Sequence, residues 1–298
     1  MPIFPDSLKP LEPGDVVGVA APASCFDADL FEKGLEALRG CGFEVRVPKP
    51  AYLRQGYLAG SDQERARAFM ELWEDPEVKA VLCARGGYGV LRILPLLDFD
   101  RLARTSKVFV GYSDITGLMQ ALMERCGLPV FHGPVITGLG RNPAHAKSLA
   151  RRLSGEWPSE WGLEDPYIIT PGSAAGLLAG GNLATLCHLA GTPFQPDFAG
   201  KIVFLEDVGE APYRIDRMLT HLRLCGMLNG MSGILLGSFY NCGADGEIRR
   251  VLADRLGGLG VPVLGGFPAG HGPENKTFPM GTPVKLDADQ ASLTFRNP

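Results

Sequence analysis

Strand-like and helix-like segments alternate through the first half of the chain. The strand-like segments cover residues 15–21, 43–47, 78–84 and 108–112. The residues between them carry apolar side chains at helical spacing. Strands separated by helices predict a parallel sheet covered on both faces, as in a Rossmann-like α/β domain. Such sheets carry their functional sites at the carboxyl ends of the strands, which directs attention to the loops after Ala84 and Tyr112.

A change of character near residue 154 predicts two domains. Residues 154–174 are rich in Gly, Pro, Trp and acidic side chains and show little periodicity. We therefore expect an N-terminal α/β domain over residues 1–153, an interdomain link over 154–174, and a smaller C-terminal α/β domain over 175–298. Strand-like segments at 201–205 and 232–239 support the α/β character of the second domain.

Composition and charge exclude several classes of function. The net charge is −4 and basic residues form no stripe, so we expect no nucleic-acid partner. No apolar run approaches the ~18 residues of a membrane span, and residues 1–13 lack an apolar signal core, which predicts a cytoplasmic protein without a membrane partner. The seven cysteines show no C-x-x-C spacing and the five histidines no H-x-x-x-H pair. We therefore expect neither a metal nor another cofactor.

The segment VFVGYSDIT, residues 108–116, runs from a buried strand through Ser113 into a helix. This order is typical of a nucleophile elbow, in which a sharp turn exposes the serine hydroxyl. The following helix start offers free N–H groups that suit an oxyanion. The match to G-x-S-x-G is partial, because Ile115 stands at the place of the second glycine. The alternative interpretation is that Ser113 only caps the helix.

A second candidate is the glycine-rich sequence Arg85-Gly-Gly-Tyr-Gly89, which follows the strand at 78–84. Glycines let backbone N–H groups approach a ligand closely, so Gly86 or Gly87 is a candidate oxyanion donor. A phosphate cradle and a plain tight turn are the alternatives, since the pattern is not G-x-G-x-x-G.

Two acidic residues and one histidine are further candidates for catalytic roles. Glu206 and Asp207 end a buried strand, and either carboxylate can orient a histidine. His271 lies between glycines in a Gly/Pro-rich loop, which makes it a better catalytic candidate than the histidines in helical or strand segments. Together these residues supply a nucleophile, oxyanion donors, a carboxylate and a base, the set that acyl transfer requires.

At this point the chain resembles the L,D-carboxypeptidases of peptidase family S66, a family that also includes the microcin C immunity proteases. Six motifs carry the resemblance in the same order along nearly the whole chain. They are Tyr57-Leu-Ala-Gly-Ser-Asp62, Ala84-Arg-Gly-Gly-Tyr-Gly89, Gly111-Tyr-Ser-Asp114, Gly180-Gly-Asn-Leu183, Leu205-Glu-Asp207 with Pro212-Tyr-Arg-Ile-Asp-Arg217, and Gly270-His-Gly272.

The resemblance implies a catalytic triad of Ser113, Glu206 and His271, with oxyanion donors at the backbone N–H groups of Gly87 and Asp114. It also implies an active site at the interface of two domains, and a homodimer. The reaction that it implies is release of the terminal D-Ala from cytoplasmic murein tetrapeptides during cell-wall recycling.

Three alternatives remain beside this expectation. The microcin C immunity branch cleaves aminoacyl-nucleotide amides, but the compact segment 206–217 offers only Tyr213 for stacking on a nucleobase. A non-catalytic ligand-binding protein has no need of all three triad residues. A nucleotide-dependent enzyme would use the loop 85–89. For the terminal carboxylate of a murein peptide, Arg85 and Arg214 are the candidate ligands.

Overall fold

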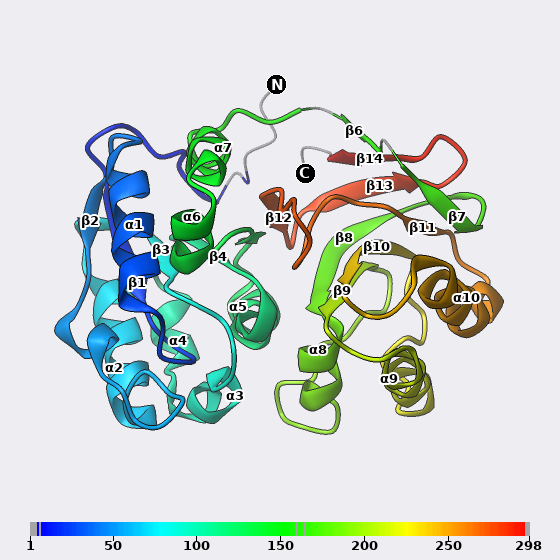
Figure 1. The fold of residues 1–298 in the computed structure, drawn as a ribbon, viewed down its shortest axis with the longest axis horizontal. Helices are drawn as coiled ribbons and strands as arrows, with labels where there is room; N and C mark the ends of the chain where they lie inside the picture. Colours follow the sequence, from blue (N-terminus) through cyan, green and yellow to red (C-terminus); the bar gives the residue numbers. More distant parts are fainter. Residues whose placement is uncertain (1–4, 6, 159, 164, 296–298) are drawn as a thin grey trace. The chain divides into compact units, whose positions relative to one another are not determined.

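The computed structural model describes residues 5, 7–158, 160–163 and 165–295. The chain divides into two compact units (Figure 1). The first unit comprises Pro2–Trp157 and Lys276–Pro279, and the second comprises Pro158–Asn275 and Met280–Pro298. The short segment 276–279 thus belongs to the first unit although it comes late in the chain.

A six-stranded sheet forms the centre of the first unit, in the order β12-β5-β4-β3-β1-β2. Strands β1 to β5 pair in parallel. Their bounds are β1 Val16–Ala20, β2 Glu44–Arg46, β3 Val78–Cys83, β4 Val108–Gly111 and β5 Val130–His132, and β12 is Phe278–Met280. The strands are rich in Val, Leu and Ala because a parallel sheet is buried on both faces.

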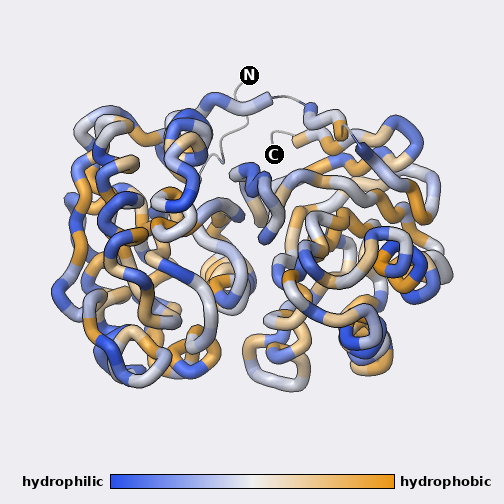
Figure 2. Tube along the Cα trace, in the orientation of Figure 1, coloured by the Kyte–Doolittle hydropathy of each residue, from blue (hydrophilic) through white to orange (hydrophobic). Residues whose placement is uncertain are grey.

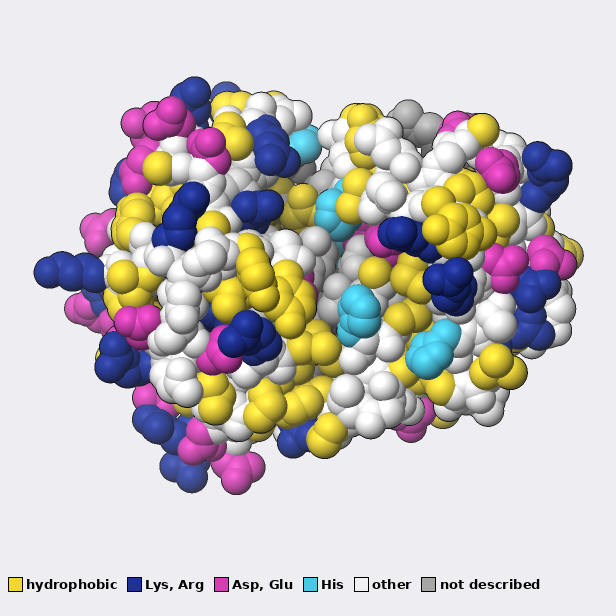
Figure 3. All heavy atoms as spheres, turned by 60° about the horizontal axis from the view of Figure 1, so that its bottom comes forward, with side chains coloured by type: hydrophobic (Ala, Val, Ile, Leu, Met, Phe, Trp, Pro, Cys, Tyr) yellow, Lys and Arg dark blue, Asp and Glu magenta, His cyan; other side chains and the backbone are white. Residues whose placement is uncertain are grey.

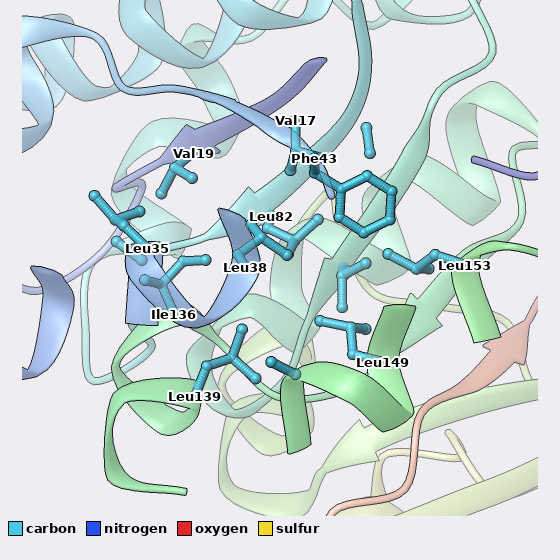
Figure 4. Packing of buried hydrophobic residues seen from close by; sticks show 14 of the residues in the cluster. Val17, Val19, Leu35, Leu38, Phe43, Leu82, Ile136, Leu139, Leu149 and Leu153 are labelled. Carbon is cyan, nitrogen blue, oxygen red and sulfur yellow. The ribbon is translucent and has the colours of Figure 1, made fainter. Parts of the chain in front are cut away.

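Helices cover both faces of this sheet, as the alternating sequence predicts. The helices are α1 Ala28–Arg39, α2 Asp62–Glu74, α3 Val90–Ile93, α4 Phe99–Leu102, α5 Thr116–Cys126, α6 Ile136–Arg141 and α7 Ala144–Leu153. On one face α1, α6 and α7 pack on β1 and β3 through a buried apolar cluster (Figure 4). On the other face the rings of Phe69 and Trp73 in α2 contact Phe109 in β4. The Rossmann-like expectation is confirmed for this unit.

The second unit is built on an eight-stranded sheet in the order β6-β14-β13-β8-β9-β10-β11-β7. Strands β8 to β11 pair in parallel, and the flanking strands pair antiparallel. The strands are β6 Glu160–Gly162, β7 Tyr167–Thr170, β8 Ser173–Asn182, β9 Ile202–Val208, β10 Gly233–Tyr240, β11 Val263–Gly265, β13 Pro283–Asp287 and β14 Ser292–Phe295. The helices are α8 Leu183–Leu189, α9 Pro212–Leu224 and α10 Asp245–Leu256.

The stretch 154–174, expected as an interdomain link, contributes two strands to this second sheet. Strand β6 pairs with β14, and β7 pairs with β11, so both edges of the sheet come from this stretch. Trp161 in β6 stacks on Phe267, with ring centroids 5.2 Å apart. Of the two tryptophans in the stretch, Trp161 is therefore a packing residue of the second unit, whereas Trp157 stacks on Phe131 in the first.

Hydropathy follows these layers within each unit. The central strands are mainly hydrophobic, and the helices alternate between hydrophobic and hydrophilic residues (Figure 2). On the face drawn in Figure 3, Lys and Arg side chains are interspersed with Asp and Glu. Among the described residues, no helix is long and apolar enough to span a membrane.

Candidate active site

Ser113 lies where β4 turns into the helical segment that leads to α5. Its φ is +66°, in the left-handed region that non-glycine residues rarely adopt. The preceding Gly111 makes room for this turn, because a Cβ there would lie 2.4 Å from a methyl carbon of Ile115. A strained serine at the carboxyl end of a strand is the geometry of a nucleophile elbow.

Ser113 does not stand at the N-cap position of either helical segment that follows β4. A short 3₁₀ turn spans Ser113–Ile115, and its N-cap position is Tyr112. The N-cap position of α5 is Ile115. The side chains of Tyr112 and Ile115, at these two N-cap positions, make no cap hydrogen bond. The serine is part of the turn and does not terminate a helix.

The glycine-rich loop 85–89 lies directly against Ser113. A Cβ on Gly86 would be 2.8 Å from the Cβ and 3.0 Å from the Oγ of Ser113, so a residue with a side chain cannot occupy this position without displacing the serine. The carboxylate of Asp114 accepts a hydrogen bond from the N–H of Val90 at 2.9 Å. This bond ties the Ser113 turn to the end of the loop, so the elements that carry Gly87 and Asp114 are fixed to each other.

Arg85 stands at the start of the same loop with an exposed side chain. Its Nη1 donates to the backbone oxygen of Cys25 at 2.8 Å. The other candidate for a carboxylate ligand, Arg214, lies in the second unit in the first turn of α9. There it forms an ion pair with Glu210 at 3.3 Å, with 56% of its side chain exposed. Each arginine thus has a partner within its own unit.

In the second unit, His271 is bound to Glu206 at the end of β9. The Nδ1 of His271 lies 2.7 Å from Oε2 of Glu206, and the backbone N–H of His271 donates to the same oxygen at 3.1 Å. Glu206 is fully buried. Gly270 permits the close approach, because a Cβ there would lie 2.6 Å from that carboxylate oxygen.

Two opposing effects act on the His271 imidazole. Burial lowers its pKa, whereas the hydrogen bond to Glu206 and the charges of Glu206 and Asp207 raise it. The electrostatic effects prevail, so the pKa of His271 lies above its ordinary value of 6.5. A carboxylate on Nδ1 leaves Nε2 as the nitrogen that can accept a proton from a nucleophile.

Asp207, the neighbouring carboxylate, binds backbone N–H groups. Its Oδ2 accepts from the N–H of Ala184 at 2.9 Å, and its Oδ1 accepts from the N–H of Val208 at 2.8 Å. Burial raises the pKa of Asp207 to about 6. The residue pattern alone allowed either carboxylate as the partner of the histidine. The contact of His271 Nδ1 with Glu206 Oε2 favours Glu206.

Asn182 joins the two carboxylates, a role that sequence reasoning did not assign. Its Nδ2 lies 3.3 Å from Oε1 of Glu206 and 3.2 Å from Oδ1 of Asp207. Its Oδ1 caps α8 by accepting from the N–H of Thr185 at 3.0 Å. The cap fixes the amide so that its donor side faces both acids. An Asn directly before a helix in Gly180-Gly-Asn-Leu183 was the available signal, and it indicates only the cap.

Within the described residues, no group of three or more His, Cys, Asp or Glu side chains has the arrangement of a metal site. The arrangement at each unit suits acyl transfer instead. The first unit presents a serine at a strained turn beside a glycine loop, and the second presents a histidine oriented by a buried carboxylate.

Each of the two units contains a region that matches a known protein family. Residues 17–133 match the LD-carboxypeptidase N-terminal domain, and residues 175–286 match the LD-carboxypeptidase C-terminal domain. A putative carboxypeptidase of Streptomyces coelicolor is 43% identical, over 97% of this chain and 95% of that protein. A probable murein peptide carboxypeptidase of Bacillus subtilis is 40% identical, over 96% and 93%. The microcin C7 self-immunity protein of Escherichia coli is 30% identical, over 96% and 94%.

Solved structures show the same fold. A muramoyltetrapeptide carboxypeptidase from Oxalobacter formigenes aligns with a TM-score of 0.82 at 30% identity, covering 95% of this chain and 99% of that one. The immunity protein MccF in complex with glutamyl sulfamoyl guanosine aligns with a TM-score of 0.88 at 26% identity, covering 99% of each chain.

Proposed function

The chain belongs to the LD-carboxypeptidase family, a family of peptidases, and from that premise we propose that it is a serine carboxypeptidase that releases the terminal D-Ala from murein tetrapeptide. The observation that carries the serine mechanism is the 2.7 Å contact between His271 Nδ1 and Glu206 Oε2. A histidine oriented by a carboxylate in this way can act as the general base that takes the proton of a nucleophile. Ser113, at its strained turn, is the nucleophile that we assign to it.

The proposed reaction begins when the Oγ of Ser113 attacks the carbonyl carbon of the bond between an L-configured centre and D-Ala. His271 takes the hydroxyl proton on Nε2, and Glu206 stabilises the imidazolium that forms. The backbone N–H groups of Gly87 and Asp114 hold the negative oxygen of the tetrahedral intermediate.

The intermediate collapses when the C–N bond breaks and His271 gives its proton to the leaving amine of D-Ala. A water molecule then attacks the acyl-serine ester while His271 takes its proton. The ester bond to Ser113 breaks, and His271 returns the proton to the Ser113 oxygen, which restores the free enzyme. The products are free D-Ala and a tripeptide, and no redox partner or metal ion is required.

Recognition of the terminal carboxylate is assigned to Arg85 or Arg214. Both guanidinium groups carry exposed surface, and a guanidinium binds a carboxylate in bidentate geometry. Amidation of the D-Ala would leave the carboxylate-binding groups unpaired, so we expect the amide to lose about 100-fold in kcat/KM.

Two observations favour a murein peptide over an aminoacyl nucleotide. Identity to two relatives named for murein peptides is 40% and 34%, against 30% for the immunity protein. In the segment 206–217, Tyr213 is the single aromatic residue. Stacking on aromatic rings contributes about 1–3 kcal/mol per base, so a segment with one ring offers little affinity for a nucleobase.

The experiment that tests this function compares four substrates. They are the tetrapeptide, its C-terminal amide, the pentapeptide that ends in D-Ala-D-Ala, and glutamyl sulfamoyl-adenosine. We expect fast release of D-Ala from the tetrapeptide and slow turnover of the other three. If the adenosine compound is the best substrate, the chain acts as an immunity-type hydrolase with the same triad. If none is cleaved while ligands bind, a non-catalytic binding role replaces the proposal.

The location and assembly of the protein follow the same premise. We propose that it acts in the cytoplasm on recycled murein peptides, and that it forms a homodimer, as the family resemblance implies. Light scattering of the purified protein tests the dimer: a mass near the 31.9 kDa of one chain contradicts it.

A further inference from the structure

The segment that follows β1 holds the glycine-rich loop 85–89 through Ser24. The backbone N–H of Ser24 donates to the oxygen of Gly86 at 3.3 Å. The Ser24 hydroxyl accepts from the N–H of Tyr88 at 3.0 Å and donates to the oxygen of Tyr88 at 3.3 Å. We infer that Ser24 is a positioning residue that aims the N–H of Gly87 at the oxyanion, an inference that rests on the proposed function.

The first step of the argument concerns the peptide unit between Gly86 and Gly87. In a planar trans peptide the C=O and the N–H point in opposite directions. Because the oxygen of Gly86 is bound to the N–H of Ser24, the N–H of Gly87 must point away from Ser24. The same peptide is confined on another side, since the side chain of Ser113 lies against the α-carbon of Gly86.

The second step concerns the next peptide unit, between Gly87 and Tyr88. The Ser24 hydroxyl binds the N–H of this unit, so both peptides that flank Gly87 are held by one residue. Gly87 has a φ of +96°, and a Cβ there would lie 2.5 Å from the Ser24 hydroxyl oxygen. A side chain at position 87 and the hydroxyl at position 24 therefore cannot coexist.

The third step separates positioning from folding. Ser24 is 7% exposed, so water competes weakly for its hydrogen bonds. The far end of the loop is anchored independently: the buried Arg65 donates to the oxygen of Gly89 at 2.9 Å, and Val90 donates to Asp114. Loss of the hydroxyl should consequently loosen the Gly87 region while the rest of the loop keeps its place.

We expect kcat to depend on the position of the Gly87 N–H, because a hydrogen-bond donor stabilises an oxyanion only within a narrow range of distances. Removal of one such donor costs about 10²–10³ in kcat, and a misplaced donor loses part of that contribution. We expect Ser24→Ala to lower kcat by about 10- to 100-fold and to change KM by less than about threefold, since the oxyanion exists in the transition state and not in the bound substrate.

The experiment uses the full chain with three variants: Ser24→Ala, Ser24→Thr and the control Ser106→Ala. The control makes the same substitution at Ser106, an exposed serine before β4, at the opposite end of that strand from Ser113. Each variant is assayed for kcat and KM on the tetrapeptide, and for the rate of phosphonylation by a fluorophosphonate. In that reaction the Ser113 oxygen forms a bond to phosphorus, fluoride leaves, and His271 takes the proton. The phosphoryl oxygen then occupies the oxyanion position.

The expected result is a parallel fall in kcat and phosphonylation rate for Ser24→Ala, recovery in Ser24→Thr, and no change in Ser106→Ala. Unchanged kcat in Ser24→Ala, or a loss confined to KM, overturns the inference. If Ser24→Ala fails to fold, Ser24→Cys keeps the volume with a weaker donor, and the same split between kcat and KM decides. Ser113→Ala is run alongside: if it retains activity, the proposed function fails, whatever Ser24 does.

Discussion

His271 Nδ1 lies 2.7 Å from Glu206 Oε2, although 65 positions separate the two residues in the chain. The same carboxylate oxygen also accepts the backbone N–H of His271, so the contact fixes both the loop and the ring. Because the carboxylate is fully buried, the charge that it places beside the imidazole is poorly screened by solvent. This relationship gives His271 one tautomer and one orientation.

Replacing the proposed nucleophile tests the mechanism most directly. Ser113→Ala should lower kcat by about 10⁴–10⁶-fold with the fold intact, because no other group at the turn can form the acyl intermediate. Steady-state kinetics with matched circular dichroism spectra measure this. A variant that keeps more than about a tenth of the activity excludes Ser113 as nucleophile.

Replacing each of the two adjacent carboxylates distinguishes their roles. Glu206→Gln keeps the shape and removes the charge, so kcat should fall by about 10⁴-fold, as for the corresponding Asp-to-Asn change in serine proteases. Asp207→Asn should cost less, because Asp207 binds the N–H groups of Ala184 and Val208. The assignment is wrong if Asp207→Asn is the more damaging variant.

The pKa of His271 predicts the pH dependence of the reaction. The general base must be neutral, so kcat/KM should fall as pH drops through a value above 6.5, the ordinary pKa of histidine. A raised pKa also means that protonation of His271 stabilises the fold at low pH, and that this contribution is lost as pH rises through the folded pKa. NMR titration of the imidazole measures the value without substrate. Glu206→Gln should lower it, and an unchanged pKa contradicts the role of Glu206.

Asn182 is predicted to hold the two acids side by side. Asn182→Ser keeps a good cap for α8 and removes the Nδ2 donor that faces Glu206 and Asp207. We expect a loss of about 1–3 kcal/mol in the free energy of unfolding, as for a hydrogen bond to a buried charged group. The matched control is Thr185→Val, which removes the 2.9 Å bond from the Thr185 hydroxyl to Asn182 Oδ1 and leaves the acids bound. Both variants keep the backbone cap bond of α8. Equal losses would therefore show that the Nδ2 bonds to the two acids contribute no more than the Thr185 hydroxyl bond, and would contradict the role of Asn182.

Metal removal provides a further test of the serine mechanism. The proposed triad needs no Lewis acid, so exhaustive treatment with EDTA and phenanthroline should leave kcat unchanged. Activity measured before and after dialysis decides the point. Loss of activity that added zinc restores requires a different mechanism.

Local sequence signals predicted the first unit well. The strand expected at 78–84 is β3, and the strand expected at 108–112 is β4, because long runs of buried apolar residues leave few alternatives. The two strands within residues 154–174 were harder to predict from the sequence, since β6 and β7 lie at sheet edges and their residues show weak periodicity. The addition of β12 next to β5 was not predictable, because nothing local encodes a pairing between segments so distant in the chain.

By itself, the sequence determined the α/β class, the strand ends that carry Ser113 and Glu206, and the glycine loop that carries His271. The tertiary structure decided which carboxylate faces the histidine. The two acids are adjacent in the sequence, and Asn182 Nδ2 lies within 3.3 Å of both carboxylates. Only packing fixes that Glu206 contacts the His271 ring while Asp207 binds the N–H of Ala184. It also decided that Ser113 occupies a left-handed turn, because a backbone angle of +66° depends on the strand, the loop and the helix that meet there.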